Sequence, residues 1–266
     1  MNQALWINYP VAARILAYLN DRTYDCPSQR PEGMLIVGDA DNGKTLILQK
    51  LKSELQARAT TDTGVIRIPL VLIQAPVGAS RREFYGSLAR AMHLPEIDRY
   101  PAARLRQRTI DAMRDAGTRA IAVDELHHLI AGGEARKRVI VDDLKYISNE
   151  LGIPVFGAGT DRALMAISRD DQYLSRMPPI MIPPWEFNRP FLSLLTSLEL
   201  ALGIPSHGLV NPNTAELIHK HSRGLIGRIV RIAKAAWMEA KLRNSQTITE
   251  DDVNRAGFSD LPWLKT

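Results

Sequence analysis

A glycine-rich segment near the amino terminus constrains what this chain can fold into more than any other feature of its sequence. Gly38, Gly43, Lys44 and Thr45 fit the pattern G-x-x-x-x-G-K-T, which follows the apolar run Met34–Val37 and precedes a segment of helical periodicity. Glycines allow the tight bend that points backbone N–H groups at phosphate oxygens, and the start of the following helix favours an anion. Because both flanks are correct, we prefer a phosphate-binding loop to the alternative of a chance match.

The residue types in this loop predict contacts with ATP and magnesium. Lys44 is expected to reach the β- and γ-phosphates, and the Thr45 hydroxyl is expected to bind Mg2+, which prefers oxygen ligands. The expected nucleotide contacts run through the whole loop: Gly38, Asp39, Ala40, Asp41, Asn42, Gly43, Lys44, Thr45 and Leu46.

Two acidic residues follow another apolar run, Ala120–Val123. Asp124 is expected to hold magnesium together with the loop threonine. Glu125 is expected to orient and polarise the water that attacks the γ-phosphate, which makes ATP hydrolysis to ADP and phosphate the predicted reaction. The alternative is that both acids only begin the next helix, where negative charge is favourable.

His127 and His128 extend this string to Asp-Glu-Leu-His-His, which superficially resembles a helicase box. A helicase needs a second comparable ATPase core, and the residues after Trp185 predict only helices. We also expect no metal site shared by the two histidines, because adjacent side chains on a helix point in different directions.

Short apolar runs alternate with longer amphipathic segments as far as residue 182, a pattern typical of a parallel sheet flanked by helices. The five expected strands are Met34–Val37, Ile66–Ile73, Ala120–Val123, Pro154–Gly157 and Ile180–Ile182. We expect the second of them to insert between the strands that carry the two motifs. After the prolines at 183 and 184, the expected elements are helices: Arg189–Leu202, Thr214–His221, Ile226–Arg243 and Thr249–Ala256. The sequence thus predicts an α/β core over residues 1–184, with a helical segment at its amino terminus, and a small α-helical domain over residues 185–266.

The composition excludes several classes of protein. The chain has 266 residues, 45% of them hydrophobic, which is enough for a buried core. No apolar run reaches the roughly 18 to 20 residues that cross a bilayer, and the amino terminus lacks a signal-peptide pattern, so we expect a cytoplasmic protein without membrane contact. A single cysteine, Cys26, excludes an intramolecular disulfide and a cysteine-based zinc cluster.

Taken together, the motifs resemble those of the AAA+ ATPases, which implies a P-loop core followed by a helical lid. The matching strings are Gly157-Ala-Gly-Thr, Leu174-Ser-Arg-Met and Gly224-Leu-Ile-Gly-Arg. The resemblance implies that Thr160 is a first sensor and Arg228 a second one, with Arg176 as an arginine finger offered to the ATP of a neighbouring subunit. The alternatives are a helix cap for Thr160, Arg162 or Arg169 as the finger, and a solvated surface position for Arg228.

Basic residues are concentrated in two segments, and the net charge of the chain is +5. The first segment contains Arg81, Arg82, Arg90, Arg99, Arg104, Arg106, Arg108, Arg114 and Arg119, and the second contains Lys220, Arg223, Arg228, Arg231, Lys234, Lys241 and Arg243. Such clusters favour binding to double-stranded DNA without base specificity, because they release counterions from the phosphate backbone. The alternative is a set of solvated helix faces. In AAA+ proteins that encircle DNA the contacts follow the second strand, which implies Arg81, Arg82, Arg99 and Tyr100 here.

Longer strings resemble the TniB and TnsC family of transposition ATPases. They are Arg14-Ile-Leu-Ala-Tyr-Leu, Leu35-Ile-Val-Gly-Asp-Ala-Asp-Asn-Gly-Lys-Thr, Ala122-Val-Asp-Glu-Leu-His-His-Leu and Gly157-Ala-Gly-Thr-Asp-Arg-Ala. The resemblance implies a homo-oligomeric filament or ring on duplex DNA that recruits a DDE transposase, of the TniA or TnsB type, and a TniQ-like targeting protein, and that disassembles on ATP hydrolysis. Two alternatives stay open: an IstB-like or initiator-like loader of another DNA enzyme, and a nucleotide-switched signalling or scaffold ATPase that does not bind DNA.

Overall fold

The computed structural model describes residues 6–24, 31–59, 66–77, 80–95, 97–129, 134–168, 174–205 and 208–258. The chain divides into two compact units. The core unit comprises Pro10–Gly38 and Lys44–Ile182, and the helical unit comprises Met1–Tyr9, Asp39–Gly43 and Pro183–Thr266. The middle of the glycine-rich loop is therefore grouped with the carboxy-terminal helices.

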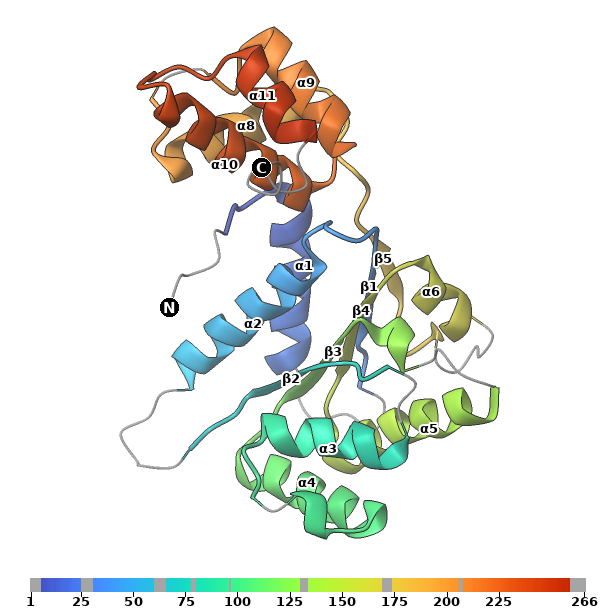
Figure 1. The fold of residues 1–266 in the computed structure, drawn as a ribbon. Coiled ribbons are helices and arrows are strands. Elements are labelled where there is room, and N and C mark those ends of the chain that lie inside the picture. Colours follow the sequence, from blue (N-terminus) through green and yellow to red (C-terminus); the bar gives the residue numbers. More distant parts are fainter. Residues whose placement is uncertain are drawn as a thin grey trace. The chain divides into compact units, whose positions relative to one another are not determined.

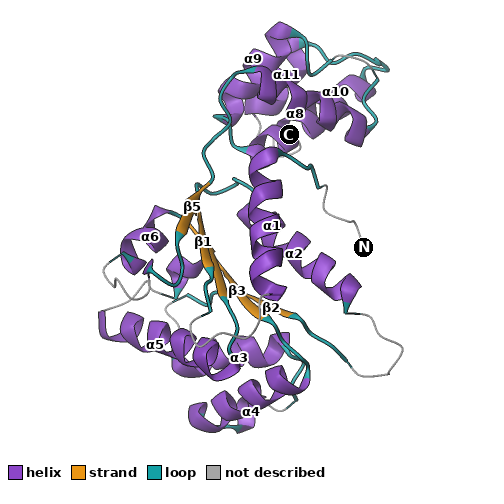
Figure 2. Ribbon diagram, turned by 180° about the vertical axis from the view of Figure 1, so that it is seen from behind, coloured by secondary structure: helices purple, strands orange, loops and turns teal. Residues whose placement is uncertain are grey.

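A five-stranded sheet forms the centre of the core unit (Figure 2). Its strands are β1 (Met34–Val37), β2 (Leu70–Gln74), β3 (Ala120–Asp124), β4 (Val155–Gly159) and β5 (Pro179–Met181), in the order β2-β3-β4-β1-β5. Every pairing is parallel, which confirms the α/β class and the five-stranded parallel sheet expected from the sequence. The three inner strands are buried throughout, as expected for parallel strands covered on both faces.

Helices cover both faces of the sheet. Figures 1 and 2 show α1 (Pro10–Tyr24) and α2 (Lys44–Arg58) on one face, with α3 (Arg81–Ala91), α4 (Ala102–Asp115) and α5 (Glu134–Leu151) on the other. The shorter elements are η1 (Ile97–Arg99), η2 (Leu126–His128) and α6 (Asp161–Ile167). Side chains from the second group of helices and from the strands form one buried apolar cluster that includes Phe84, Leu105 and Ile121.

The expected position of the second strand is wrong. β2 lies at the edge beside β3, and β4 is the strand inserted between β1 and β3. β4 contains Gly157, where an added Cβ would lie 2.9 Å from the terminal side-chain atoms of both Leu126 and Met177, so a larger residue here would have to displace these two side chains. β2 also starts later than expected, because Ile66 is 79% exposed and Pro69, directly before the strand, has no N–H to donate.

The helical unit contains α8 (Arg189–Leu202), α9 (Pro212–Ser222), α10 (Ile226–Leu242) and α11 (Glu250–Phe258). α9 begins two residues before the expected Thr214, because the Asn211 side chain caps it and Pro212 suits a first helical turn. Trp185 also belongs to this unit, since its N–H donates to the Gly224 carbonyl over 2.8 Å. Among the helices of the described ranges, none is long and apolar enough to span a membrane.

Candidate nucleotide-binding site

The glycine-rich loop connects β1 to α2, and the side chain of Lys44 folds back across it. Lys44 is buried, and its Nζ donates a hydrogen bond to the Gly38 carbonyl over 2.9 Å. Asp41 and Gly43 have φ values of 63° and 82°, in the left-handed region that tight bends require and that glycine adopts readily. The predicted loop is therefore a sharp bend at the carboxyl end of β1.

Thr45 and Asp124 meet at the carboxyl edge of the sheet. Thr45 lies in the first turn of α2, and its Oγ1 donates to Oδ2 of Asp124 over 2.6 Å. Asp124 ends β3, and its Oδ1 accepts from the N–H of Glu125 over 2.9 Å. A hydroxyl beside a buried carboxylate provides the hard oxygen donors that Mg2+ prefers, so this pair fits the ion.

Glu125 leaves β3 in a strained conformation. Its φ of 52° and ψ of 41° place it in the left-handed region, which is uncommon for glutamate and occurs often at functional sites. The carboxylate Oε2 lies 3.3 Å from Nε2 of His127. Burial, the largest cause, lowers the pKa of His127, which favours the neutral form of the ring.

The prediction that His127 and His128 point in different directions is wrong. Their ring centroids are 4.3 Å apart, and both rings lie near the Glu125 carboxylate. The two histidines lie in the 3-10 turn η2 rather than in an α-helix. The N–H of His128 donates to the Glu125 carbonyl over 2.8 Å, which closes the turn and keeps His128 near Glu125.

Thr160 follows β4 at this same edge of the sheet. It occupies the position before α6, but its side chain makes no capping hydrogen bond to that helix, so the cap alternative is not formed. The preceding Gly159 permits close packing here, since an added Cβ would lie 2.6 Å from Cβ of Ala163 and 3.7 Å from Nδ1 of His127.

Arg176 lies at the opposite edge of the sheet. Its carbonyl accepts from the N–H of Gly33, just before β1, whereas Lys44 and Asp124 lie at or beyond the carboxyl ends of β1 and β3. The guanidinium Nη1 donates to Oδ1 of Asn149 on α5 over 2.7 Å. Arg176 is therefore remote from the phosphate loop of its own chain.

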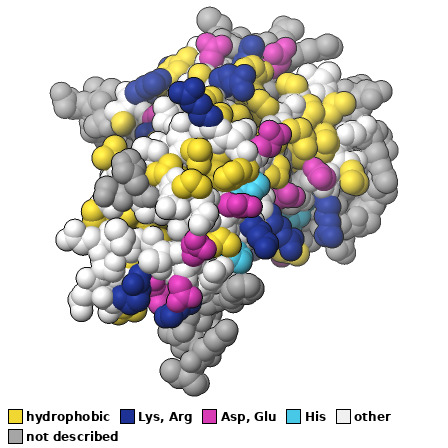
Figure 3. All heavy atoms as spheres, turned by 90° about the horizontal axis from the view of Figure 1, so that it is seen from above, with side chains coloured by type: hydrophobic (Ala, Val, Ile, Leu, Met, Phe, Trp, Pro, Cys, Tyr) yellow, Lys and Arg dark blue, Asp and Glu magenta, His cyan; other side chains and the backbone are white. Residues whose placement is uncertain are grey.

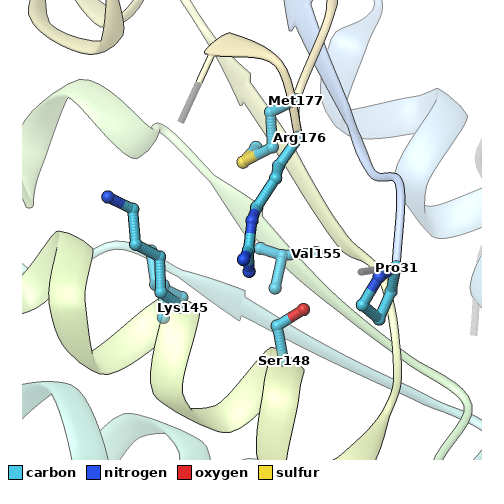
Figure 4. A pocket seen from close by; sticks show the side chains of 7 residues that line it. Pro31, Lys145, Ser148, Val155, Arg176 and Met177 are labelled. Carbon is cyan, nitrogen blue, oxygen red and sulfur yellow. The ribbon is translucent and has the colours of Figure 1, made fainter. Parts of the chain in front are cut away.

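A small pocket surrounds the Arg176 side chain. Figure 4 shows it pointing toward Ser148 of α5 and Val155 of β4, with Lys145 also lining the pocket. Of the two alternative finger residues, Arg162 is exposed on α6, near His127 at the carboxyl edge. Arg169 lies outside the described residues.

Arg228 reaches the glycine-rich loop within the helical unit. Its Nε lies 3.6 Å from Oδ2 of Asp41, and Arg231 donates to the same oxygen over 3.0 Å. Gly227 makes this approach possible, because its N–H donates to the Asp41 carbonyl over 2.7 Å and an added Cβ would lie 2.8 Å from that oxygen. Arg231 was not among the expected site residues, although its position three residues after Arg228 puts both on one helix face.

Comparison with known proteins identifies the family. The family described as "Bacterial TniB protein" matches residues 1–187. The chain belongs to the TniB family. No curated protein matches it.

Solved structures similar to this TniB-family chain show its fold. The ORC2 protein of Aeropyrum pernix, solved as ADPNP-ADP complexes, is 16% identical with a TM-score of 0.66, over 93% of this chain and 66% of that one. The ORC1 protein of the same organism, in complex with DNA, is 16% identical with a TM-score of 0.69, over 92% and 63%. The RuvB branch migration motor of Thermotoga maritima is 14% identical with a TM-score of 0.58, over 92% and 67%. The TniB-family chain thus spans about two thirds of each of these structures, and it has the AAA+ ATPase fold.

The arginines expected to contact DNA have partners within the core unit of this TniB-family protein. Arg81 Nε lies 2.6 Å from Oδ2 of Asp143, a carboxylate that is 2% exposed and that also accepts from the Tyr85 hydroxyl. The hydrogen bond to Asp143 raises the pKa of Arg81. Arg82 donates to the carbonyls of Asp98 and Tyr100. Arg81 therefore neutralises a buried acid, and Arg82 anchors the turn around η1.

Tyr100 is surrounded by further arginines. The guanidinium of Arg108 lies 4.4 Å from the ring centroid and that of Arg104 lies 5.3 Å from it, while the hydroxyl accepts from Arg108. Arg99, in η1, is exposed. The arginines around Tyr100 lie close to one another. On the face shown in Figure 3, basic side chains are instead interspersed with acidic and hydrophobic ones.

Proposed function

We propose that this protein is an ATP-hydrolysing regulator of DNA transposition that assembles on duplex DNA with ATP and disassembles after hydrolysis. One observation carries the proposal: Lys44, Thr45, Asp124 and Glu125, from two motifs about 80 residues apart, converge at one edge of the sheet. This is the set of groups that phosphoryl transfer requires, namely a lysine for the phosphates, oxygen ligands for magnesium and a carboxylate for the attacking water.

Each residue has a distinct task in the proposed reaction. The backbone amides of the loop and the Lys44 ammonium bind the phosphate oxygens, with Lys44 exchanging the Gly38 carbonyl for phosphate. Thr45 and Asp124 would hold Mg2+, and the ion would neutralise charge that develops on the transferring group. Glu125 orients the attacking water and accepts its proton. The Thr160 hydroxyl binds the same water or the γ-phosphate.

Arg228 is proposed to sense the γ-phosphate. It now lies beside Asp41, a carboxylate that it shares with Arg231. A triphosphate in the loop offers a stronger anionic partner for the planar guanidinium, so Arg228 would turn to the phosphate while Arg231 keeps Asp41.

Arg176 is proposed to act on the nucleotide of a neighbouring protomer. It lies at the edge of the sheet opposite Lys44, so it cannot reach a nucleotide bound by its own chain. We expect Arg176→Ala to bind ATP but to lose most of its turnover. Lys44→Ala should also be inactive, because it binds no ATP. Mixing the two variants should restore phosphate release, since Arg176 from the second can complete the nucleotide site of the first. Full activity of Arg176→Ala alone, or no recovery over a series of mixing ratios, would contradict action between protomers.

The protomers are proposed to assemble on double-stranded DNA. Support comes from the arginines on α3, η1 and α4, and a structural neighbour, the ORC1 protein, has been solved in complex with DNA. Arg81 is a poor residue to mutate, because its removal would leave Asp143 buried without its cation.

We therefore expect the double substitution Arg82→Gln and Arg99→Gln to weaken DNA binding equally for unrelated duplexes. The slope of log affinity against log salt concentration should fall by about 0.9 for each DNA phosphate that the variant no longer neutralises. Fluorescence anisotropy at several salt concentrations measures both quantities. Arg255→Gln is the control, because Arg255 lies in α11 and pairs with Asp251 on the surface. An unchanged slope in the double variant would remove these two arginines from the DNA interface.

The proposed partners are a DDE transposase of the TniA or TnsB type and a TniQ-like targeting protein, and they are inferred from the family. A loader of another DNA enzyme would show the same nucleotide chemistry, whereas a signalling ATPase would self-associate with ATP whether or not DNA is present. Electron microscopy with duplex DNA and a slowly hydrolysed ATP analogue separates these cases. DNA-dependent filaments or rings that retain transposase in a pull-down support the proposal. Assemblies indifferent to DNA, or retention of a replicative helicase instead, would replace it with an alternative.

A further inference from the structure

Three side chains that follow β3 lie close together, and the proposed hydrolysis uses only one of them. One metal-ligating atom from each of Glu125, His127 and His128 lies within 4.8 Å of the other two, and Glu125 Oε2 is 3.3 Å from His127 Nε2. We propose that these three side chains form a binding site for a zinc ion, distinct from the magnesium site at Thr45 and Asp124.

The distances agree with zinc coordination. Zinc binds histidine nitrogen and carboxylate oxygen at about 2.0 to 2.2 Å in tetrahedral geometry, so ligand atoms lie roughly 3.3 to 3.6 Å apart around the ion. The Glu125–His127 pair already has that separation. A ligand atom of His128 lies within 4.8 Å of the other two, so only side-chain adjustment is needed to bring it to the same separation. Three protein ligands leave a fourth position for water.

The ligand chemistry separates this site from the magnesium site. Imidazole nitrogens are preferred by zinc and other borderline transition metals, whereas magnesium takes oxygen ligands such as Thr45 and Asp124. Millimolar magnesium should therefore not compete strongly for the histidines.

One ring nitrogen of each histidine lacks a hydrogen-bond partner among the described residues. These atoms are Nδ1 of His127 and Nδ1 of His128, and both are buried. Buried polar atoms are usually satisfied, and a purely structural turn would place apolar residues here at lower cost. The observation that favours a cation is the gathering of one ligand atom from each of the two imidazoles and the carboxylate within 4.8 Å of one another.

Zinc at this site would inhibit hydrolysis, a consequence that rests on the proposed function. A carboxylate that coordinates zinc cannot accept a proton from the attacking water. The ion would therefore hold the protein in its ATP-bound state without affecting the contacts of Lys44 and Thr45.

The first experiment measures metal binding alone, on nucleotide-free protein in excess magnesium. Zinc binding is followed by competition with a chromophoric chelator, and cobalt(II) serves as a spectroscopic probe whose visible absorption reports tetrahedral coordination. The wild-type protein should bind one equivalent. His127→Gln and His128→Gln should each reduce the affinity at least about tenfold. His93→Asn is the matched control, because His93 is exposed, lies outside the cluster and has a positive φ that asparagine tolerates.

The second experiment titrates zinc into the ATPase reaction. Inhibition of the wild type at the zinc concentration that fills the site, and a shift of inhibition to higher zinc in His128→Gln, support the proposal. Equal zinc affinity in the wild type and both cluster variants would overturn it, and so would an octahedral cobalt spectrum. If metal binds as expected but no ATPase activity exists to inhibit, the metal site stands and the proposed function fails. If the ATPase is active and the binding experiment finds no zinc, the proposed function stands and the metal site fails.

Discussion

Replacing Glu125 by glutamine is expected to slow ATP hydrolysis by roughly 10² to 10⁴-fold while ATP binding persists, because that is the range a positioned general base contributes. Glutamine keeps the shape of the side chain but cannot accept a proton from water. Binding should survive, since the contacts that shape the loop join Lys44 to Gly38 and Thr45 to Asp124, without the Glu125 side chain.

Two measurements on the Glu125→Gln variant separate chemistry from binding. Phosphate release should fall to near background in single-turnover conditions, and the dissociation constant for a fluorescent ATP analogue should stay within a few-fold of the wild-type value. Glu150→Gln is a suitable control, because Glu150 forms an exposed ion pair with Arg114 on the core unit, and such pairs contribute little to stability. Wild-type phosphate release by Glu125→Gln would assign the activation of water to another residue.

The same variant also tests whether hydrolysis controls assembly. If hydrolysis drives disassembly, Glu125→Gln should form assemblies on duplex DNA that persist with ordinary ATP, as the wild type does only with a slowly hydrolysed analogue. Light scattering after a challenge with excess competitor DNA follows their lifetime. If the variant disassembled at the wild-type rate, disassembly would not depend on ATP hydrolysis.

The sequence predicted the positions of those site residues whose local conformation depends on a few neighbours in the chain. A glycine at a positive φ, a lysine that opens a helix and an acid that ends an apolar strand are recognisable from a few adjacent residues. The parallel sheet was predictable for a similar reason, since strands buried on both faces read as continuous apolar runs. Gly43, Lys44 and Asp124 therefore lie where their motifs placed them.

The failures concern relations that short motifs do not encode. The lateral order of strands follows from packing between elements, and no short motif encodes the close contact of Gly157 in β4 with Leu126 and Met177. The pairing of Arg81 with Asp143 joins residues 62 apart in sequence, so a residue that reads as a DNA contact is partly a structural one. The convergence of His127 with His128 occurs in a short turn that follows a left-handed Glu125, where an α-helix was assumed.

Removing the Lys44 side chain is expected to abolish ATP binding, and with it every ATP-dependent property of the protein. Lys44 is buried, and its Nζ is held over the loop by the Gly38 carbonyl, so the ammonium is already positioned for phosphate oxygens and little side-chain entropy is lost on binding. Alanine removes that charge from a site where a triphosphate carries several negative charges, and the remaining loop amides alone must hold it.

A thermal-shift titration measures the effect of Lys44→Ala on binding. ATP that binds only the folded wild type at 100 times its dissociation constant should stabilise it by about 2.7 kcal/mol, which raises Tm by several degrees, whereas the variant should show no ATP-dependent rise. Lys52→Ala is the matched control, because Lys52 is an exposed lysine further along the same helix. The variant's own Tm without nucleotide shows whether it folds. A folded Lys44→Ala protein with the wild-type response to ATP would mean that the nucleotide binds elsewhere, and the functions proposed for Thr45, Asp124 and Glu125 would fall with it.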